Sequence, residues 1–333
     1  MYYWRTSVTD PHPYELLSPD MVIDAVESTG LVSDLRILAL NSYENRVYQV
    51  GIEGAEPLIV KFYRPERWSD AQILEEHHFC QQLVDAEIPV VPPTPNAAGE
   101  TLHTHAGFRF SLYTRKGGHA PALDDLDSLF QLGRLAARIH GIAALEDFTH
   151  RPSLTVESFG DSSAVFLLQH FIPQPLRPAY ETLTRDLLYR IRQRFDEVKP
   201  EYQRVHGDCH VGNILWRGND VHFVDLDDSR MAPAIQDIWM FMSGNRDAQQ
   251  RQISELVEGY NEFFDFPVRQ LPLIEALRSL RIMHYSAWLA RRWSDPAFPR
   301  TFPWFNTERY WAEHILELRE QLALLNEPPL EIF

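Results

Sequence analysis

The sequence is poor in cysteine and in positive charge. Its 333 residues include 2 cysteines, Cys80 and Cys209, so no disulfide framework is expected and the count fits a reducing compartment. The 31 lysines and arginines are outnumbered by 47 aspartates and glutamates, which gives a formal net charge of −16. This acidity argues against nucleic acid or an anionic membrane as the main partner, and it favours a cationic substrate only modestly.

The sequence also lacks targeting and membrane segments. Met1 to Arg5 is followed by polar residues instead of a long apolar core, so no signal peptide is expected. No stretch reaches the roughly eighteen consecutive apolar residues of a membrane-spanning helix. Hydrophobic residues make up 44% and charged residues 23% of the chain, as in an ordinary globular enzyme with room for two lobes.

Polar residues are concentrated around a predicted β-hairpin between His206 and Asp228. Two short pieces that are β-branched or aromatic, 214–216 and 221–224, flank a polar turn at 217–220 that contains glycine and asparagine. This pattern is typical of a tight β-hairpin. Such a hairpin brings the loop before its first strand beside the residue that ends its second strand, so Asp208, Asn213 and Asp225 should meet.

Phosphoryl transfer needs these residue types in this arrangement. A carboxylate, here Asp208, must orient a nucleophilic hydroxyl and receive its proton. An amide oxygen and a second carboxylate, here Asn213 and Asp225, must hold Mg²⁺ against the triphosphate. These hard oxygen ligands suit Mg²⁺ and not a soft metal. We therefore predict Asp208 and Asp225 as catalytic residues, with Asn213 and Asp225 as the metal ligands.

Two other interpretations of this segment stay open. The carboxylates could be incidental to an acidic hairpin. A soft-metal site could use His206, Cys209 and His210, although the spacing is cramped and these ligands would compete with Asp208.

The hairpin motif resembles the catalytic and metal-binding motifs of aminoglycoside phosphotransferases and choline kinases. His206, Gly207, Asp208 and Asn213 match the pattern H-G-D-x-x-x-x-N, and Asp225 falls in a following hydrophobic-hydrophobic-D-x-D pattern. These families are relatives of the protein kinases, with glycine where protein kinases usually carry arginine. The resemblance implies ATP and Mg²⁺ as cofactors.

Three predicted strands near the N-terminus, 35–40, 46–52 and 58–63, form an antiparallel meander. Lys61 lies inside the third strand, where a charge is costly unless its ammonium group meets anions. In a kinase-like lobe this lysine meets the ATP phosphates and a helix glutamate. The alternative is an edge-strand lysine that points to water.

A helix is predicted from a capping box at Ser69 and Gln72 to about Val84. Glu76 lies on the apolar face of this helix, so we predict it as the partner of Lys61, with Glu75 as the alternative. The turn at 41–45 lies where a nucleotide-covering loop belongs but contains no glycine. Ser42 is its best-placed donor to a phosphate; a plain polar turn is the other interpretation.

The domain bounds follow from these elements. Two more strands, 101–105 and 108–113, end at Thr114 to Gly118, which we interpret as a hinge whose backbone holds adenine. We expect an N-terminal nucleotide-binding lobe over residues 1–113 and a mostly helical catalytic and substrate lobe over 119–333. The fold class is α+β: a bilobal protein-kinase-like fold with an antiparallel sheet and one main helix in the first lobe.

The segment after the hairpin is too short for a long phosphorylatable activation loop, because Asp237 follows Asp225 closely. With Gly207 in place of the usual arginine, no cation at that position waits for a phosphate. We therefore expect that phosphorylation of such a loop does not switch the enzyme on.

Several local strings resemble one group more closely, the bacterial stress response kinase A family. They are Leu40 to Arg46, Lys61 to Trp68, His206 to His210, Asp237 to Met240 and Ala287 to Trp293. The resemblance covers nearly the whole chain. It implies a cytoplasmic, monomeric, ATP- and Mg²⁺-dependent Ser/Thr protein kinase that protects against oxidative and envelope stress and stress-induced cell death. By the same resemblance Asp208 is the proton acceptor, Asn213 and Asp225 carry Mg²⁺, and Ser42 lies at the ATP site.

Two rival functions remain at this point. The same machinery would serve a small-molecule kinase acting on an aminoglycoside, choline or an amino-alcohol, and the acidic balance suits a cationic acceptor. A binding module or pseudokinase is disfavoured because Lys61, Asp208, Asn213 and Asp225 are all intact. We expect no nucleic-acid or membrane partner, and the sequence does not name the physiological acceptor.

Overall fold

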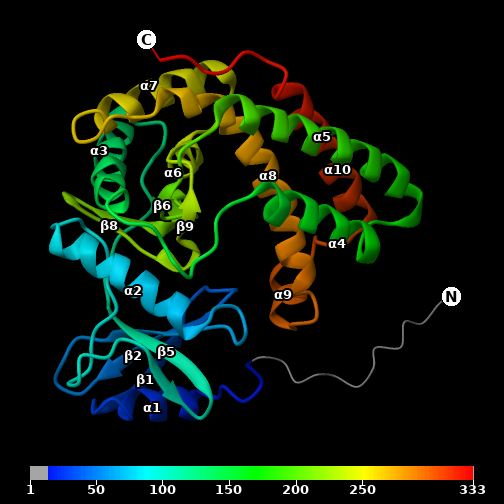
Figure 1. Cartoon of the computed structure of the whole chain (residues 1–333). Coiled ribbons are helices and arrows are strands. Elements are labelled where there is room, and N and C mark those ends of the chain that lie inside the picture. The colour runs from blue at the N-terminus through cyan, green and yellow to red at the C-terminus, as the bar shows by residue number, and fades with distance from the viewer. Residues whose placement is uncertain (1–13, 333) are drawn as a thin grey trace. The chain divides into compact units, whose positions relative to one another are not determined.

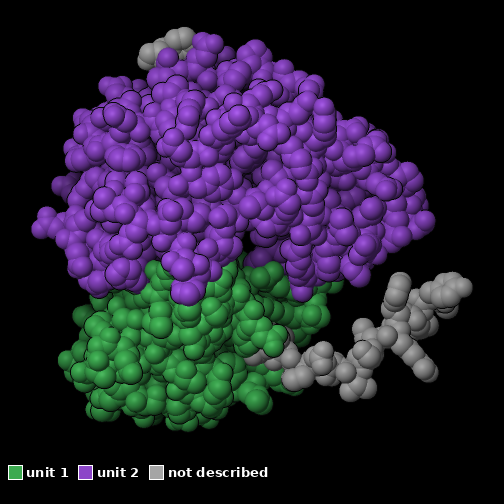
Figure 2. Space-filling model, viewed as in Figure 1, with its two compact units in different colours: residues 1–77, 92–115, 292–303 green, residues 78–91, 116–291, 304–333 purple. Residues whose placement is uncertain are grey.

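The structure is a computed structural model that describes residues 14–332 (Figure 1). Met1 to Arg5, on which the signal-peptide expectation depends, lies outside the described residues. The chain divides into two compact units, each assembled from separate segments (Figure 2). Unit 1 comprises residues 1–77, 92–115 and 292–303; unit 2 comprises residues 78–91, 116–291 and 304–333. The functional bounds predicted from the sequence, with a hinge at 114–118, stay a prediction.

Unit 1 is built on a five-stranded antiparallel sheet with the order β1-β2-β3-β5-β4. The strands are β1 (Ser33–Ala39), β2 (Arg46–Ile52), β3 (Leu58–Phe62), β4 (His103–His105) and β5 (Phe108–Thr114). The predicted meander is confirmed, and β4 is shorter than expected. Because β3 pairs with both β2 and β5, it is an interior strand of the sheet.

One face of this sheet is covered by helix α1 (Pro19–Glu27), whose N-terminal cap is Ser18. The Met21 N–H donates to Ser18 Oγ at 3.2 Å, which satisfies one of the unpaired donors of the first turn. Val22 of α1 is fully buried in one cluster with Val60 and Phe62 of β3. Side chains alternate along a strand, so Lys61, between those two, lies on the opposite face.

Helix α2 (Asp70–Asp85) begins with the predicted capping box. The Ser69 N–H donates to Gln72 Oε1 at 2.9 Å, and the Gln72 N–H donates to Ser69 Oγ at 3.3 Å. This reciprocal pair fixes where the helix starts. It also fixes the phase of the helix, which buries Glu76 and leaves Glu75 half-buried.

Unit 2 is mostly helical. Its main helices are α3 (Leu126–Ala143), α4 (Ser162–His170), α5 (Arg177–Val198), α6 (Ile235–Ile238), α7 (Arg246–Tyr260), α8 (Ile274–Arg291) and α10 (Glu308–Leu324), whereas α9 (Ala297–Thr301) belongs to unit 1. A π-helical turn, η1 (Glu157–Asp161), precedes α4. Helices α3 and α7 approach closely because Gly133 has no Cβ, which would lie 2.0 Å from the Leu256 carbonyl oxygen.

Two small antiparallel pairs complete unit 2. Strands β7 (Ile214–Arg217) and β8 (Asp220–Phe223) form the predicted hairpin, closed by Gly218 and Asn219. Strands β6 (Gln203–Val205) and β9 (Arg230–Ala232) pair with each other, and both are too short to show a sequence pattern. Over residues 14–332, none of the helices combines the length and apolarity that crossing a bilayer requires.

Candidate active site

The β7–β8 hairpin positions the predicted catalytic residues of unit 2. Its register pairs Ile214 with Phe223, and the Val224 N–H donates to the Asn213 carbonyl at 2.9 Å. Asp225 therefore follows directly after the residue bound to Asn213. The Asn213 Nδ2 donates to the Asp208 carbonyl at 3.0 Å. The structure thus brings Asp208, Asn213 and Asp225 together through one hairpin and one short loop.

The two predicted metal ligands offer oxygen atoms. The Asn213 amide nitrogen is used on the Asp208 carbonyl, which leaves its Oδ1 facing away as a free acceptor. Asp225 is exposed and has left-handed backbone angles, φ 60° and ψ 61°. A non-glycine residue held in that region costs about 1–3 kcal/mol, and such strain gathers at functional sites. One amide and one carboxylate oxygen fit Mg²⁺, which takes its remaining ligands from water and phosphate.

The alternative soft-metal site receives no support. His206 Nε2 is 3.0 Å from the Val224 carbonyl oxygen, and Cys209 is buried. Burial, together with the charges of Asp237 and Asp208, raises the pKa of the Cys209 thiol well above its ordinary value, which disfavours the thiolate form that a soft metal binds. Within residues 14–332, no group of three or more histidine, cysteine or acidic side chains is arranged to hold a metal ion.

Asp208 is partly buried and lies beside an arginine and a histidine. Its Oδ1 lies 2.6 Å from Arg281 Nη1, and its Oδ2 lies 3.4 Å from His210 Nε2. Burial acts to raise the pKa of Asp208, but the His210 hydrogen bond and the Arg281 charge outweigh it and lower the pKa to about 2. Asp208 is therefore a carboxylate at neutral pH. No feature of the sequence indicated that Arg281, on α8, would reach it.

The catalytic loop is anchored by Asp237, whose carboxylate is 1% exposed. Asp237 Oδ2 accepts the His206 N–H at 2.7 Å, and Oδ1 accepts the Gly207 N–H at 2.9 Å. His140 Nε2 lies 3.1 Å from the same Oδ2, and His140 Nδ1 lies 2.8 Å from the Tyr260 hydroxyl oxygen. This network fixes the loop backbone. The sequence signal was an aspartate directly before the apolar run Ile238–Phe241, where a buried charge needs partners.

Gly207 occupies a position that only glycine fits. Its φ is +86°, and a Cβ there would lie 2.2 Å from the Asp228 carbonyl oxygen. Both the backbone angle and the space therefore exclude arginine, the usual protein-kinase residue. Glycine at this position lets the loop that carries Asp208 pack closely against the main chain at Asp228.

In unit 1, Lys61 is 6% exposed and Glu76 is 3% exposed. Both side chains act electrostatically on the buried Tyr63. Burial raises the pKa of the Tyr63 hydroxyl, Glu76 raises this pKa further, and Lys61 lowers it. The Lys61 Nζ lies 5.3 Å from the centre of the Tyr63 ring. Because β3 is an interior strand, Lys61 is not the edge-strand residue of the alternative interpretation. The burial of Glu76 favours it over Glu75 as the acidic partner.

The turn that carries Ser42 is held by its own hydrogen bonds. The Ser42 hydroxyl donates to the Asn45 carbonyl at 2.9 Å, and Asn45 Oδ1 accepts the Arg64 N–H at 3.0 Å. Glu44 in the same turn lies 2.6 Å from Arg292 Nη2. Ser42 is half-buried, and its hydroxyl hydrogen must turn from the main chain before it can be donated to a phosphate.

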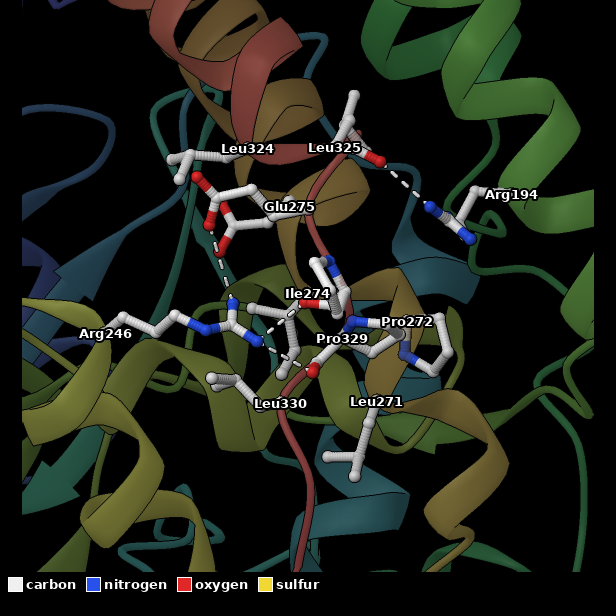
Figure 3. Close-up of a pocket in the computed structure, with 12 residues that line it drawn as sticks. Arg194, Arg246, Leu271, Pro272, Ile274, Glu275, Leu324, Leu325, Pro329 and Leu330 are labelled. Carbon is white, nitrogen blue, oxygen red and sulfur yellow. Dashed lines mark hydrogen bonds and ion pairs between the residues drawn. The ribbon is translucent and has the colours of Figure 1, made fainter.

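A separate pocket in unit 2 lies against the C-terminal segment (Figure 3). It encloses about 30 Å³, and none of the predicted site residues lines it. Arg246 Nη2 donates to the carbonyls of Pro328 and Pro329 at 2.7 and 2.9 Å, and Arg194 donates to the Leu325 carbonyl at 2.8 Å. A space this small holds about one water molecule, so the contacts dock the chain end instead of forming an acceptor site.

Comparison with known proteins defines the class. The sequence pattern of the phosphotransferase enzyme family matches residues 36–271, which include every predicted site residue. Solved structures with the same fold include the amicoumacin kinase hAmiN in complex with AMP-PNP, Ca²⁺ and Ami, with a TM-score of 0.69, 20% identity and coverage of 96% of this chain and 97% of that one. A microcompartment-associated aminopropanol kinase gives a TM-score of 0.69 at 18% identity, covering 91% of this chain and 96% of that one. The fold is therefore that of the protein-kinase-like phosphotransferases.

Closer relatives narrow the class. Stress response kinase A of Escherichia coli (strain K12) is 41% identical over 320 residues, 96% of this chain and 97% of that protein. The serine/threonine protein kinase RdoA of Salmonella typhimurium is 41% identical over 322 residues, again 96% of this chain and 97% of that protein. The chain belongs to the stress response kinase A family of phosphotransferases.

Proposed function

We propose that this chain is an ATP- and Mg²⁺-dependent Ser/Thr protein kinase of the bacterial stress response, acting in the cytoplasm as a monomer. The observation that carries the proposal is the hairpin that gathers Asp208, Asn213 and Asp225, with a base kept ionised by His210 and Arg281. The choice of a protein acceptor is supported by the Salmonella typhimurium relative, which is named as a serine/threonine protein kinase. Protection from oxidative and envelope stress and from stress-induced cell death belongs to the same proposal.

Each residue has a defined task in this reaction. Asp208 accepts the proton of the acceptor hydroxyl as its oxygen bonds to the γ-phosphorus of ATP and the bond to the β-phosphate oxygen breaks. Asn213 and Asp225 would hold Mg²⁺, which neutralises the charge of the triphosphate when bound. Lys61, oriented by Glu76, binds phosphate oxygens, and Ser42 donates to them. The backbone of 114–118 binds adenine. Residues 1–113 form the nucleotide-binding lobe, and residues 119–333 form the catalytic and substrate lobe.

A radiolabelled ATP assay tests this proposal. We expect label on a generic Ser/Thr protein acceptor, dependent on Mg²⁺ and lost in the Asp208→Asn variant. The same mixture without protein acceptor but with a panel of amino-alcohols and an aminoglycoside provides the comparison. Label on neither kind of acceptor would contradict phosphotransferase activity itself.

The second candidate is a small-molecule kinase. The net charge of −16 favours it, because an acidic protein attracts the cationic acceptors of that class. Faster transfer to an amino-alcohol or aminoglycoside than to the protein acceptor would establish it. Arg281, 2.6 Å from Asp208, argues against a cationic acceptor at this position.

A further inference from the structure

Asp208 lies beside an arginine, although the whole chain is acidic and the charge of Asp228 also acts on it. Arg281, on α8, lies 2.6 Å from Asp208 Oδ1, and its side chain is 36% exposed. His210 lies 3.4 Å from the other carboxylate oxygen. An acceptor hydroxyl that donates to Asp208 must therefore lie beside an arginine. A cationic amine on that acceptor would be repelled at this position, which is an element of specificity against it.

Neighbouring side chains hold this region of unit 2 in shape. The Phe159 ring stacks on His284 of α8 with centres 4.1 Å apart, and the Arg230 guanidinium carbon lies over the Phe159 ring, 4.9 Å from its centre. Arg230 is committed to Asp228, with its Nη2 2.7 Å from Asp228 Oδ1 and its Nε donating to the Asp228 carbonyl at 2.8 Å. Arg281 differs from Arg230 because it combines contact with the base and exposure to solvent.

The face of α8 that carries Arg281 continues as an aromatic surface. Residues three, four and seven positions apart share one helix face, so His284, Tyr285 and Trp288 follow Arg281 along α8. The Tyr285 and Trp288 rings stack with centres 5.7 Å apart, and Tyr285 is 40% exposed. Such a surface suits the flanking residues of an extended acceptor better than a compact amino-alcohol.

We propose that the acceptor carries an anionic group, a carboxylate or a phosphate, next to the hydroxyl that receives the phosphoryl group, and that Arg281 binds this anion. A guanidinium presents five N–H donors in a fork that matches carboxylate and phosphate oxygens, and Arg281 meets Asp208 through Nη1, 2.6 Å from Oδ1. The inference deepens the proposed function and rests on it, because it names the acceptor class of the same site.

Two sources supply this chemistry: a Ser/Thr peptide with an acidic neighbour, or a small hydroxy acid. The test uses one serine peptide in three forms, with aspartate, alanine or lysine beside the serine, together with a free hydroxy acid and its amino-alcohol analogue. Radiolabelled ATP reports kcat/KM for each. A charge-assisted hydrogen bond contributes roughly 1.5–3 kcal/mol, so we expect the acidic peptide to exceed the neutral one by about 10- to 100-fold.

Variants of α8 separate recognition from structure. Arg281→Gln should bring the acidic-to-neutral ratio close to one, Arg281→Lys should keep part of it, and Arg281→Glu should make the lysine peptide the better substrate. Arg278→Gln is the matched control: Arg278 lies one turn earlier and pairs with Glu275 at 3.0 Å, so the ratio should stay at the wild-type value. A merely structural role of Arg281 would lower all three peptides by the same factor.

A measurement on the wild type makes the test independent of variant folding. An acidic peptide with alanine in place of the serine should inhibit competitively, and its lysine twin should not. Three results would overturn the inference while phosphotransfer itself stands. They are equal inhibition by the two alanine-containing peptides, a wild-type preference for the neutral or basic peptide, and an equal loss of kcat/KM on all peptides in Arg281→Gln. Transfer to the hydroxy acid but to no peptide would keep the anionic acceptor and identify the small molecule as its source. Absence of transfer to every acceptor would overturn the proposed function and this inference with it.

Discussion

Single residues near the hairpin differ in their tasks because their surroundings differ. Asp237 is enclosed and accepts main-chain N–H groups, whereas Asp208 is 24% exposed at its side chain and faces Arg281. Asp225 is exposed and held in a strained backbone conformation. These three aspartates share one side chain, but their surroundings suit Asp237 to anchoring the main chain, and suit Asp208 and Asp225 to the proposed tasks of proton acceptor and metal ligand.

Replacing the proposed base tests the first of these assignments. Asp208→Asn should lower kcat by roughly 10²- to 10⁴-fold, the usual contribution of a general base, with little change in the KM for ATP. Steady-state kinetics with the protein acceptor measures this. Asp220→Asn, an exposed hairpin position, is the matched control and should leave kcat unchanged. Full turnover in Asp208→Asn would remove Asp208 from the mechanism.

Replacing the proposed metal ligand separates binding from proton transfer. Asp225→Ala should abolish productive binding of Mg²⁺·ATP, because only Asn213 then remains of the predicted oxygen pair. Isothermal titration of Mg²⁺·ATP against wild type, Asp225→Ala and the base variant makes the comparison. Wild-type affinity in Asp225→Ala would count against the metal assignment; the base variant should retain nucleotide affinity.

A buried histidine away from the site predicts how stability depends on pH. Burial lowers the pKa of His314 to about 4 from an ordinary value of 6.5. Between these pH values the unfolded chain binds more protons than the folded chain. The contribution of His314 to the free energy of unfolding is therefore fully present above about pH 6.5 and falls by on the order of 3 kcal/mol as the pH drops toward 4. Urea unfolding across this range should show a shallower decline in His314→Leu. The exposed His170→Leu should follow the wild type, and an unchanged decline in His314→Leu would contradict the assignment.

At the scale of elements, the segment after the hairpin is fixed rather than switchable. Ser229 is the only hydroxyl residue between Asp227 and Asp237, and it is fully buried. The Arg151 Nε donates to the Ser229 carbonyl at 2.6 Å, and β9 pairs Arg230 with Val205 of β6. The one hydroxyl that a kinase could modify in residues 227–237 is therefore not exposed at the surface.

Activity should therefore not require phosphorylation there. Peptide mass spectrometry of the active enzyme should find residues 227–237 unmodified, and phosphatase treatment should leave turnover unchanged. Glu44→Gln changes a different loop and does not bear on this measurement. Any activity that depends on a phosphate must be assigned to the peptide that carries the phosphate. An obligatory phosphate on Ser229 would overturn the expectation that came from the short spacing.

The sequence predicted those features of the site whose interacting residues lie close together along the chain, and it did not predict those whose partners lie far apart. The hairpin, the capping box at Ser69 and the phase of α2 all follow from residues within about one turn or one strand of each other, and all are confirmed. Arg281 and Asp237 were missed because their partners lie far away along the chain. No local pattern encodes which face of α8 meets the catalytic loop, since helix packing decides it.

At the scale of the whole molecule, the chain order does not match the compact units. Residues 292–303 belong to unit 1, although they follow nearly all of unit 2 and lie beyond residues 36–271, which the family pattern matches. Two acidic residues tie them in. Asp295 lies 3.2 Å from both Arg46 Nη2 and Arg64 Nη1, and Glu44 lies 2.6 Å from Arg292 Nη2. These ion pairs explain why a late segment completes an early unit.

Removing Asp295 should therefore loosen unit 1 selectively. The Asp295 side chain is 1% exposed. Its loss removes the buried counter-charge of Arg46 and leaves Arg64 with Glu44, 3.7 Å away, which costs roughly 3–5 kcal/mol. In Asp295→Asn, hydrogen exchange should accelerate in peptides from β2 and β3 and stay at the wild-type rate in α5. The exposed Asp265→Asn should change neither. Equal acceleration of hydrogen exchange in both units would contradict this prediction. Exchange in α5 can rise only if the opening of unit 1 also opens unit 2, so 292–303 would then stabilise both units as one cooperative body.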